Sequence, residues 1–325
     1  MIHIFRNGIQ GGGGDYIMIF SDSSRGRNFS KDPAVVKFQG VYYLYYSLFD
    51  FQDSKSAMTG WSIGIAVSHD LETWEKAGEI TPQMPCEKDG ICAPEAIVIN
   101  GKIHLFYQTY GSFIHDAICH AISADGINFI HNPTNPVFSP TGNWNMGRAI
   151  DADVVEHDGK LLLYFATRDI TEKVQILGVA SAPIDSSFSR GEWYQECNDS
   201  ILTPQLPWEQ QCIEAPAVCK HEGKLYMFYA GAYNNCPQQI GCAVSMDGVN
   251  WKRIFTEPFL PNGKSGEWNS SESGHPYIFK DEDERMYLFF QGNNDNGNTW
   301  YISKAEIGWN NGIPFLEKVD SGGKV

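Results

Sequence analysis

Five segments with an acidic residue or a histidine at the first or second position, each continuing as a β-strand, decide the fold of this chain. They read DPAVVKFQGVYYLYYS from Asp32, PEAIVINGKIHLFYQ from Pro94, DADVVEHDGKLLLYFA from Asp151, EAPAVCKHEGKLYMFYA from Glu214 and HPYIFKDEDERMYLFF from His275. Aligned on Asp32, Glu95, Asp151, Glu214 and His275, the copies lie 63, 56, 63 and 61 residues apart. A period of this length, filled with short strands, is typical of a β-propeller with one blade per repeat.

The internal order of each repeat supports this fold. In four copies the first strand runs into a Gly-containing hairpin turn, at Gln39-Gly40, Asn100-Gly101, Asp158-Gly159 and Glu222-Gly223. Asn-Gly and Asp-Gly favour two-residue hairpins because both positions tolerate positive φ. An aromatic second strand, a loop and a third strand follow. We predict an all-β, five-bladed propeller of four-stranded antiparallel blades around a central channel, with blades beginning near residues 32, 94, 151, 214 and 274.

We expect one propeller domain over residues 1–325, with the glycine-rich residues 1–15 as a flexible arm. Closing the ring requires strands from both ends of the chain in one blade, or another latch. Residues 16–20 and 314–319 are the candidates to meet there.

Bulk composition limits the partners. A formal charge of −15 and a pI near 5.0 argue against nucleic acid or an anionic membrane as partner and favour a neutral or cationic ligand. No 18-residue apolar run is present, and the N-terminus is a poor secretory signal, so we expect a cytoplasmic protein, with periplasmic or secreted locations left open. The eight cysteines form no CxxC pair, which favours reduced thiols. The sequence does not indicate an oligomeric state.

Four acids at or near the starts of channel-lining strands point to chemistry. In a propeller the innermost strands line the channel, so Asp32, Glu95, Asp151 and Glu214 should converge. Carboxylates crowded in a partly dry site repel one another, and some of their pKa values must rise. Such a site can hold a carboxylate base and a carboxylic acid at one pH.

The motifs KDPAVV at Asp32, RAIDADVV at Asp151 and IEAPAV at Glu214 resemble the three catalytic acids of glycoside hydrolase family 43 and its clan. The order Asp, Asp, Glu on blades one, three and four and the gaps of 119 and 63 residues are similar to that family. Ala93-Pro94-Glu95 resembles its blade-two motif, where Asp is usual, and Gly274-His275 its blade-five histidine.

The resemblance implies an inverting glycosidase with Asp32 as general base, Glu214 as general acid and Asp151 as the residue that tunes the acid. Asp153, two residues along the same strand face, is the rival for the third role. The expected substrate is a neutral glycan, cleaved by an α-L-arabinofuranosidase or β-xylosidase type of activity. No cofactor is expected, although His275 could hold a channel ion such as Ca²⁺, as related propellers suggest.

Several other residues are candidates for substrate binding. Glu95 occupies the blade-two motif, and Arg148 and Arg168 flank the third acid. Asn234, Glu272, His275 and Gln291 could bind sugar hydroxyls, and aromatic residues on predicted loops could stack on sugar faces: Trp61, Phe113, Trp144, Tyr233 and Trp268.

Three alternatives stay open. A retaining fructosidase is disfavoured because its Asn-Asp-Pro-Asn-Gly and Glu-Cys-Pro motifs are absent from the sequence. A neoagarooligosaccharide-type hydrolase would use a His as the acid. A propeller could also bind glycans without cleaving them.

Overall fold

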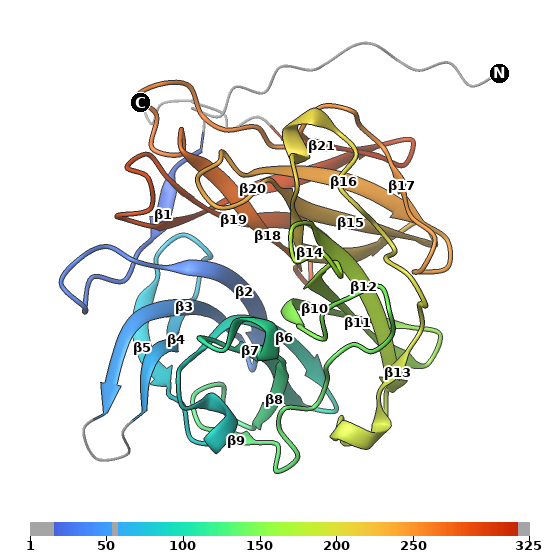
Figure 1. Ribbon diagram of the computed structural model, residues 1–325. Coiled ribbons are helices and arrows are strands. Elements are labelled where there is room, and N and C mark those ends of the chain that lie inside the picture. The colour runs from blue at the N-terminus through green and yellow to red at the C-terminus, as the bar shows by residue number, and fades with distance from the viewer. Residues whose placement is uncertain (1–15, 54–57, 318–325) are drawn as a thin grey trace.

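The computed structural model describes residues 16–53 and 58–317 and folds them into five antiparallel sheets arranged as blades around a central axis (Figure 1). Each inner strand contacts the inner strand of the next blade, and the last contacts the first. The predicted five-bladed propeller is therefore confirmed. The predicted arm at residues 1–15 lies outside the described residues.

Blades one to four have the expected four strands each. Blade one contains β2 (Lys31–Phe38), β3 (Val41–Asp53), β4 (Met58–Ser68) and β5 (Glu75–Ile80). Blade two contains β6 (Ile91–Ile99), β7 (Lys102–Thr109), β8 (Ile118–Ser123) and β9 (Phe129–His131). Blade three contains β10 (Ile150–His157), β11 (Lys160–Arg168), β12 (Gln175–Pro183) and β13 (Tyr194–Gln195). Blade four contains β14 (Ile213–His221), β15 (Lys224–Gly231), β16 (Gln239–Ser245) and β17 (Lys252–Arg253).

The fifth blade closes the ring. Its innermost strand is β18 (Glu272–Lys280), followed outward by β19 (Met286–Asn293) and β20 (Tyr301–Asn310). The N-terminal β1 (Met18–Phe20) and the C-terminal β21 (Ile313–Leu316) both pair with β20, at different parts of its length. Both ends of the chain thus meet in one blade as predicted, and this sheet has five strands instead of four.

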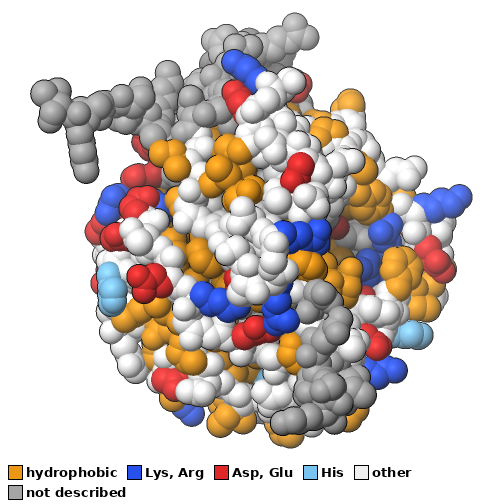
Figure 2. All heavy atoms as spheres, turned by 90° about the vertical axis from the view of Figure 1, so that its left-hand side faces the viewer, with side chains coloured by type: hydrophobic (Ala, Val, Ile, Leu, Met, Phe, Trp, Pro, Cys, Tyr) orange, Lys and Arg blue, Asp and Glu red, His pale blue; other side chains and the backbone are white. Residues whose placement is uncertain are grey.

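The only helices in the described residues are four single turns of 3-10 helix: η1 (Pro85–Glu87), η2 (Phe113–His115), η3 (Arg190–Glu192) and η4 (Pro207–Glu209). None of these is long and apolar enough to cross a bilayer. The surface carries interspersed acidic and basic side chains on the face that Figure 2 displays.

The four predicted Gly-containing turns all have positive φ at both central residues, for example 49° at Asn100 and 70° at Gly101. This is the type I′ geometry that matches the twist of the flanking strands. The aromatic second strands that follow these turns supply much of the core, with Tyr45, Tyr107 and Phe228 fully buried. Local turn chemistry and strand burial therefore agree with the ring topology.

A bulge at the start of every inner strand forms the structural repeat. At each bulge the register with the second strand shifts, and one residue has φ between 44° and 53°. These residues are Asp32, Ala93, Asp151, Ala215 and His275. The alignment on Glu95 was therefore wrong by two residues, and that on Glu214 by one, because the backbone repeat follows the bulge and not the acid.

Candidate active site

Asp32 lies at the head of β2 between two basic side chains. His275 Nδ1 is 3.1 Å and Lys31 Nζ 3.9 Å from Asp32 Oδ1. Burial alone would raise the pKa of Asp32, but the charges of Lys31 and His275 and a hydrogen bond from Ser47 hold it below its ordinary value. Asp32 is thus kept as a carboxylate, the form that can accept a proton.

Glu214 accepts hydrogen bonds from neutral amides. Its Oε1 accepts hydrogen bonds from Gln238 Nε2 at 2.7 Å and Asn234 Nδ2 at 3.2 Å, and its Oε2 accepts one from Gln175 Nε2. Burial raises the pKa of Glu214, and the hydrogen bond from Gln238 and the charge of Lys31 only partly oppose it. Glu214 therefore retains its proton to higher pH than Asp32 does.

Asp151 lies near both of these acids. Burial, with the negative charges of Glu214 and Asp32, raises the pKa of Asp151 well above its ordinary value, and Arg148 partly opposes this shift. A third acid in this position makes the protonation of the cluster a shared property of its members. The structure brings Asp32, Asp151 and Glu214 together. Lys31, which is next to Asp32, donates a 2.8 Å hydrogen bond from Nζ to Asn234 Oδ1, and Asn234 in turn donates to Glu214.

Side chains of the preceding blade fix the bulges on which these acids lie. The N–H of Asp32 donates to Gln291 Oε1 at 2.8 Å, and that of Asp151 to Gln108 Oε1 at 2.6 Å. The N–H of His275 donates to Gln238 Oε1 at 3.2 Å. Positive φ is unfavourable for residues with a Cβ, so these hydrogen bonds stabilise the backbone conformation that positions the side chains of Asp32, Asp151 and His275.

Gln291 and Glu272 are less available to a sugar than the sequence indicated. Gln291 Nε2 donates to Glu272 Oε1 at 2.7 Å, while Glu272 Oε2 accepts from the N–H of Asn235 at 2.7 Å. Both side chains are fully buried, and burial raises the pKa of Glu272 to about 7. Gln291 therefore holds the backbone N–H of Asp32, and Glu272 holds Gln291 in place. Asn234 differs, because it is only half-buried and bonds both Lys31 and Glu214.

Glu95 does not join the other acids. It lies with Asp153 in a pocket near the other ends of the inner strands, which Val36, Lys37 and Phe279 also line. Burial and the charge of Asp153 raise the pKa of Glu95 well above its ordinary value. The expected single ring of four acids is therefore wrong: the channel has one acid cluster at the strand starts and a separate pair, Glu95 and Asp153, further along.

The two predicted arginines lie beside Glu214. Arg148 Nη1 donates to Gln175 Oε1 at 3.4 Å, and Gln175 in turn donates to Glu214. Arg168 Nη1 donates to the hydroxyl of Tyr233. The Cζ atoms of Arg148 and Arg168 are 5.1 and 5.9 Å from the centre of the Phe113 ring.

Sequence reasoning named Gln291 but missed Lys31 and three other glutamines of the site: Gln108, Gln175 and Gln238. Lys31 Nζ lies 4.5 Å from the centre of the Trp300 ring and 5.8 Å from that of Trp61, so it makes cation–π contacts with both rings. Its position directly before the bulge was the available signal. Of the predicted loop aromatics, Trp144 and Trp268 pack against Phe165 and Phe290 in the core.

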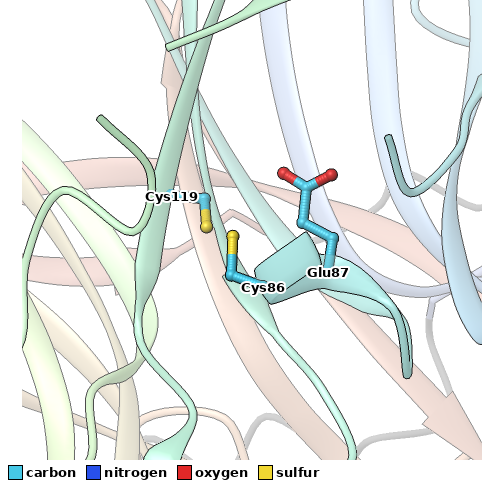
Figure 3. Close-up of side chains that lie close together, drawn as sticks. All are labelled: Cys86, Glu87 and Cys119. Atoms are coloured by element: carbon cyan, nitrogen blue, oxygen red, sulfur yellow. The ribbon is translucent and has the colours of Figure 1, made fainter. Parts of the chain in front are cut away.

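The residues around His275 do not fit a metal held by the protein. Calcium needs several oxygen ligands, while His275 already has Nδ1 at Asp32. In the part of the chain that the structure describes, one group of three side chains has metal-ligand atoms within 4.8 Å of one another: Cys86, Glu87 and Cys119 (Figure 3).

That group has a structural explanation. The Glu87 carboxylate in η1 accepts the N–H groups of Gln83 and Met84 and the hydroxyl of Tyr107. Glu209 makes the same three kinds of bond in η4, next to Trp208 instead of a cysteine. Figure 3 shows the Glu87 carboxylate turned away from the two facing sulfurs. Glu87 therefore fastens an inter-blade loop, and we assign no metal to it.

An ionised Asp and a buried Glu with a raised pKa, close to a third acid, provide the pair of carboxyl groups that glycoside hydrolysis uses as base and acid. The model of glycosyl hydrolases family 43 matches residues 26–314. The chain therefore belongs to this family, and the resemblance in its sequence motifs is confirmed.

Known proteins are similar over much of the chain. A 1,2-beta-oligomannan phosphorylase of Thermoanaerobacter sp. (strain X514) is 29% identical over 212 residues, which are 62% of this chain and 64% of that protein. A thermostable family-43 glycoside hydrolase has the same fold with a TM-score of 0.73, at 20% identity over 92% of this chain and 96% of that one. An alpha-L-arabinofuranosidase from Lactobacillus brevis aligns with a TM-score of 0.67, at 17% identity over 88% and 93%.

Proposed function

We propose that the protein is an inverting glycosidase that releases a neutral pentose, of the α-L-arabinofuranosidase or β-xylosidase type. The observation that carries this proposal is the contrast between the surroundings of two acids in one buried cluster. Basic groups contact Asp32, whereas neutral amides contact Glu214. The basic groups favour the carboxylate form of Asp32, whereas burial raises the pKa of Glu214 more than its amide partners and Lys31 lower it, which favours the carboxylic acid.

In the proposed reaction, Asp32 removes a proton from water as the water oxygen attacks the anomeric carbon. Glu214 donates its proton to the glycosidic oxygen as the bond between that oxygen and the anomeric carbon breaks. Burial keeps Glu214 protonated, Asp151 shares the protons of the cluster with it, and Asn234 donates a hydrogen bond that orients its carboxyl group. One sugar is released as a hemiacetal of inverted configuration and the other with a free hydroxyl.

His275 is poorly suited to serve as the acid, as a neoagarooligosaccharide-type hydrolase would require. Burial lowers the pKa of His275, although the charge of Asp32 opposes this. Its Nδ1 also lies 3.1 Å from the residue assigned as base. These two observations support Glu214 over His275.

Phosphorolysis is a second candidate, because one similar protein is a phosphorylase. Phosphate would replace water on the Asp32 side, where Lys31 and His275 could meet its charge.

A screen of nitrophenyl glycosides and plant oligosaccharides, each with and without inorganic phosphate, separates these possibilities. We expect phosphate-independent release of arabinose or xylose. Release of a sugar phosphate would establish phosphorolysis, and binding without cleavage of any substrate would favour a glycan-binding propeller.

A further inference from the structure

In the part of the chain that the structure describes, the guanidinium groups of Arg148 and Arg168 make no close ion pair, although Arg148 is near enough to Asp116, Asp151 and Glu214 to oppose the rise in their pKa values. Among the described residues, the carboxylate nearest to Arg148 as an ion-pair partner is Asp116, at a long 4.0 Å, and Arg168 has none within that distance. The Nε atoms of both arginines are buried without a hydrogen-bond partner. Buried cationic donors are costly unless an anion pairs with them.

The place of this charge relative to the acid decides what it could bind. Gln175 bonds both Glu214 and Arg148, so the pair lies on the Glu214 side of the pocket. A general acid protonates the leaving oxygen, and the leaving sugar must therefore lie on that side. The basic groups that could serve an attacking phosphate, Lys31 and His275, contact Asp32 instead.

Phe113 adds a face suited to a sugar ring. It is 48% exposed, at the start of η2, and its ring lies within 6 Å of both guanidinium carbons. Phe113 has φ of 49°, which is unfavourable for a residue with a Cβ and is common in segments that clamp ligands. An aromatic ring stacks on the apolar face of a sugar while arginines bind a carboxylate through paired N–H groups.

We propose that Arg148, Arg168 and Phe113 form a leaving-group subsite that binds an acidic sugar, a uronic acid, through its carboxylate. This inference rests on the proposed function, since it uses Glu214 to define the leaving-group side. It also departs from the neutral or cationic ligand that the net charge of −15 favours, because two local guanidinium groups act at shorter range than the distributed surface charge. The substrate would carry a neutral sugar on a uronic acid.

The test is direct binding, which does not depend on turnover. Calorimetric titration of the full chain would compare sodium D-galacturonate and D-glucuronate with D-galactose and D-glucose, which lack only the carboxylate. Charge-assisted hydrogen bonds predict a preference of roughly 10- to 100-fold for the uronates. In Arg168→Gln this preference should fall to about twofold or less, with the neutral sugars unaffected.

Arg285→Gln is the matched control, because Arg285 is an exposed arginine paired with Asp283 on the fifth-blade hairpin. It should retain the full preference, and thermal unfolding of both variants checks that they fold. Equal affinity for uronates and neutral sugars in the wild-type protein would overturn the subsite, even if the enzyme cleaves neutral glycosides. Uronate binding without any cleavage would retain the subsite and overturn the glycosidase.

Inorganic phosphate presents a similar oxyanion and forms the remaining arm of the test. We expect millimolar phosphate to compete with the uronates weakly and to leave the rate of cleavage unchanged. Phosphate that binds at Arg168 and accelerates cleavage would instead assign this pair to the attacking anion and contradict the proposal.

Discussion

At the scale of single residues, the different surroundings of Asp32 and Glu214 lead to a pH and leaving-group prediction. Since the pKa of Asp32 is lowered and that of Glu214 is raised, kcat/KM should follow a bell-shaped pH profile. Glu214→Ala should remove the basic limb and slow poor leaving groups by about 10²–10⁴-fold. Activated aryl leaving groups need little protonation and should be affected far less.

Asp32→Ala is the control for this experiment, because attack by water is required for every substrate. It should slow good and poor leaving groups alike. If Glu214→Ala retains the basic limb and penalises all leaving groups equally, another residue is the acid.

A second residue-scale prediction concerns Glu95, which lies with Asp153 away from the catalytic candidates. Both acids have raised pKa values in the folded protein, so the folded state binds protons more tightly than the unfolded state does. Stability should then fall as pH rises from about 4, the pKa of unfolded carboxyl groups, through the raised values. In Glu95→Gln the free energy of unfolding should fall less between pH 5 and pH 8, as urea titrations at each pH would measure.

The same variant tests whether Glu95 contacts substrate. Because the structure separates Glu95 from Asp32 and Glu214, we expect kcat/KM of the variant to stay within about threefold of the wild-type value. A large loss of activity, or unfolding curves that shift in parallel at both pH values, would contradict this assignment.

Residue-level sequence reasoning went wrong at Glu95 for a definable reason. The sequence alignment places acidic side chains in register, whereas in four of the five blades the residue directly after the positive-φ bulge residue is a proline: Pro33, Pro94, Pro216 and Pro276. Three of the supporting glutamines could not be found in this way. Gln108 contacts Asp151 across 43 residues of sequence, and nothing local to either residue encodes that contact.

At the scale of elements, the N-terminal strand makes the ring closure testable. Tyr16, two residues before β1, is buried, its ring lies 5.6 Å from that of Phe290, and its carbonyl accepts the Trp268 Nε1–H at 2.8 Å. Tyr16→Ala should lower the free energy of unfolding by about 3 kcal/mol, as for other buried aromatic truncations. Ile17→Ala is the control, since Ile17 is 71% exposed, and urea denaturation of both should show a change for Tyr16 alone.

Hairpins and strand order were predictable because their signals are local. The Gly-containing turns encode positive φ, and the aromatic strands encode burial on both faces. The fifth strand of blade five was not predicted, because the edge of β20 accepts β1 and β21 at separate registers. Only the folded geometry decides whether such ends share an edge.

At the scale of the whole molecule, the propeller brings residues from four blades into one pocket although they are up to 243 positions apart, from Asp32 to His275. The period of the repeats predicted this convergence. The sequence named Arg148 and Arg168 but not their place beside Glu214, because both lie in or just before blade three and Glu214 in blade four, so the contact depends on how the two blades pack.

The central claim is that Asp32 activates water while Glu214 protonates the leaving group. Proton NMR during the first turnovers on an oligosaccharide or nitrophenyl substrate reads the configuration of the released sugar before it mutarotates. We predict an anomer inverted relative to the substrate and no covalent intermediate. Retention of configuration, or a glycosyl adduct trapped on Asp32, would make Asp32 a nucleophile and contradict the mechanism.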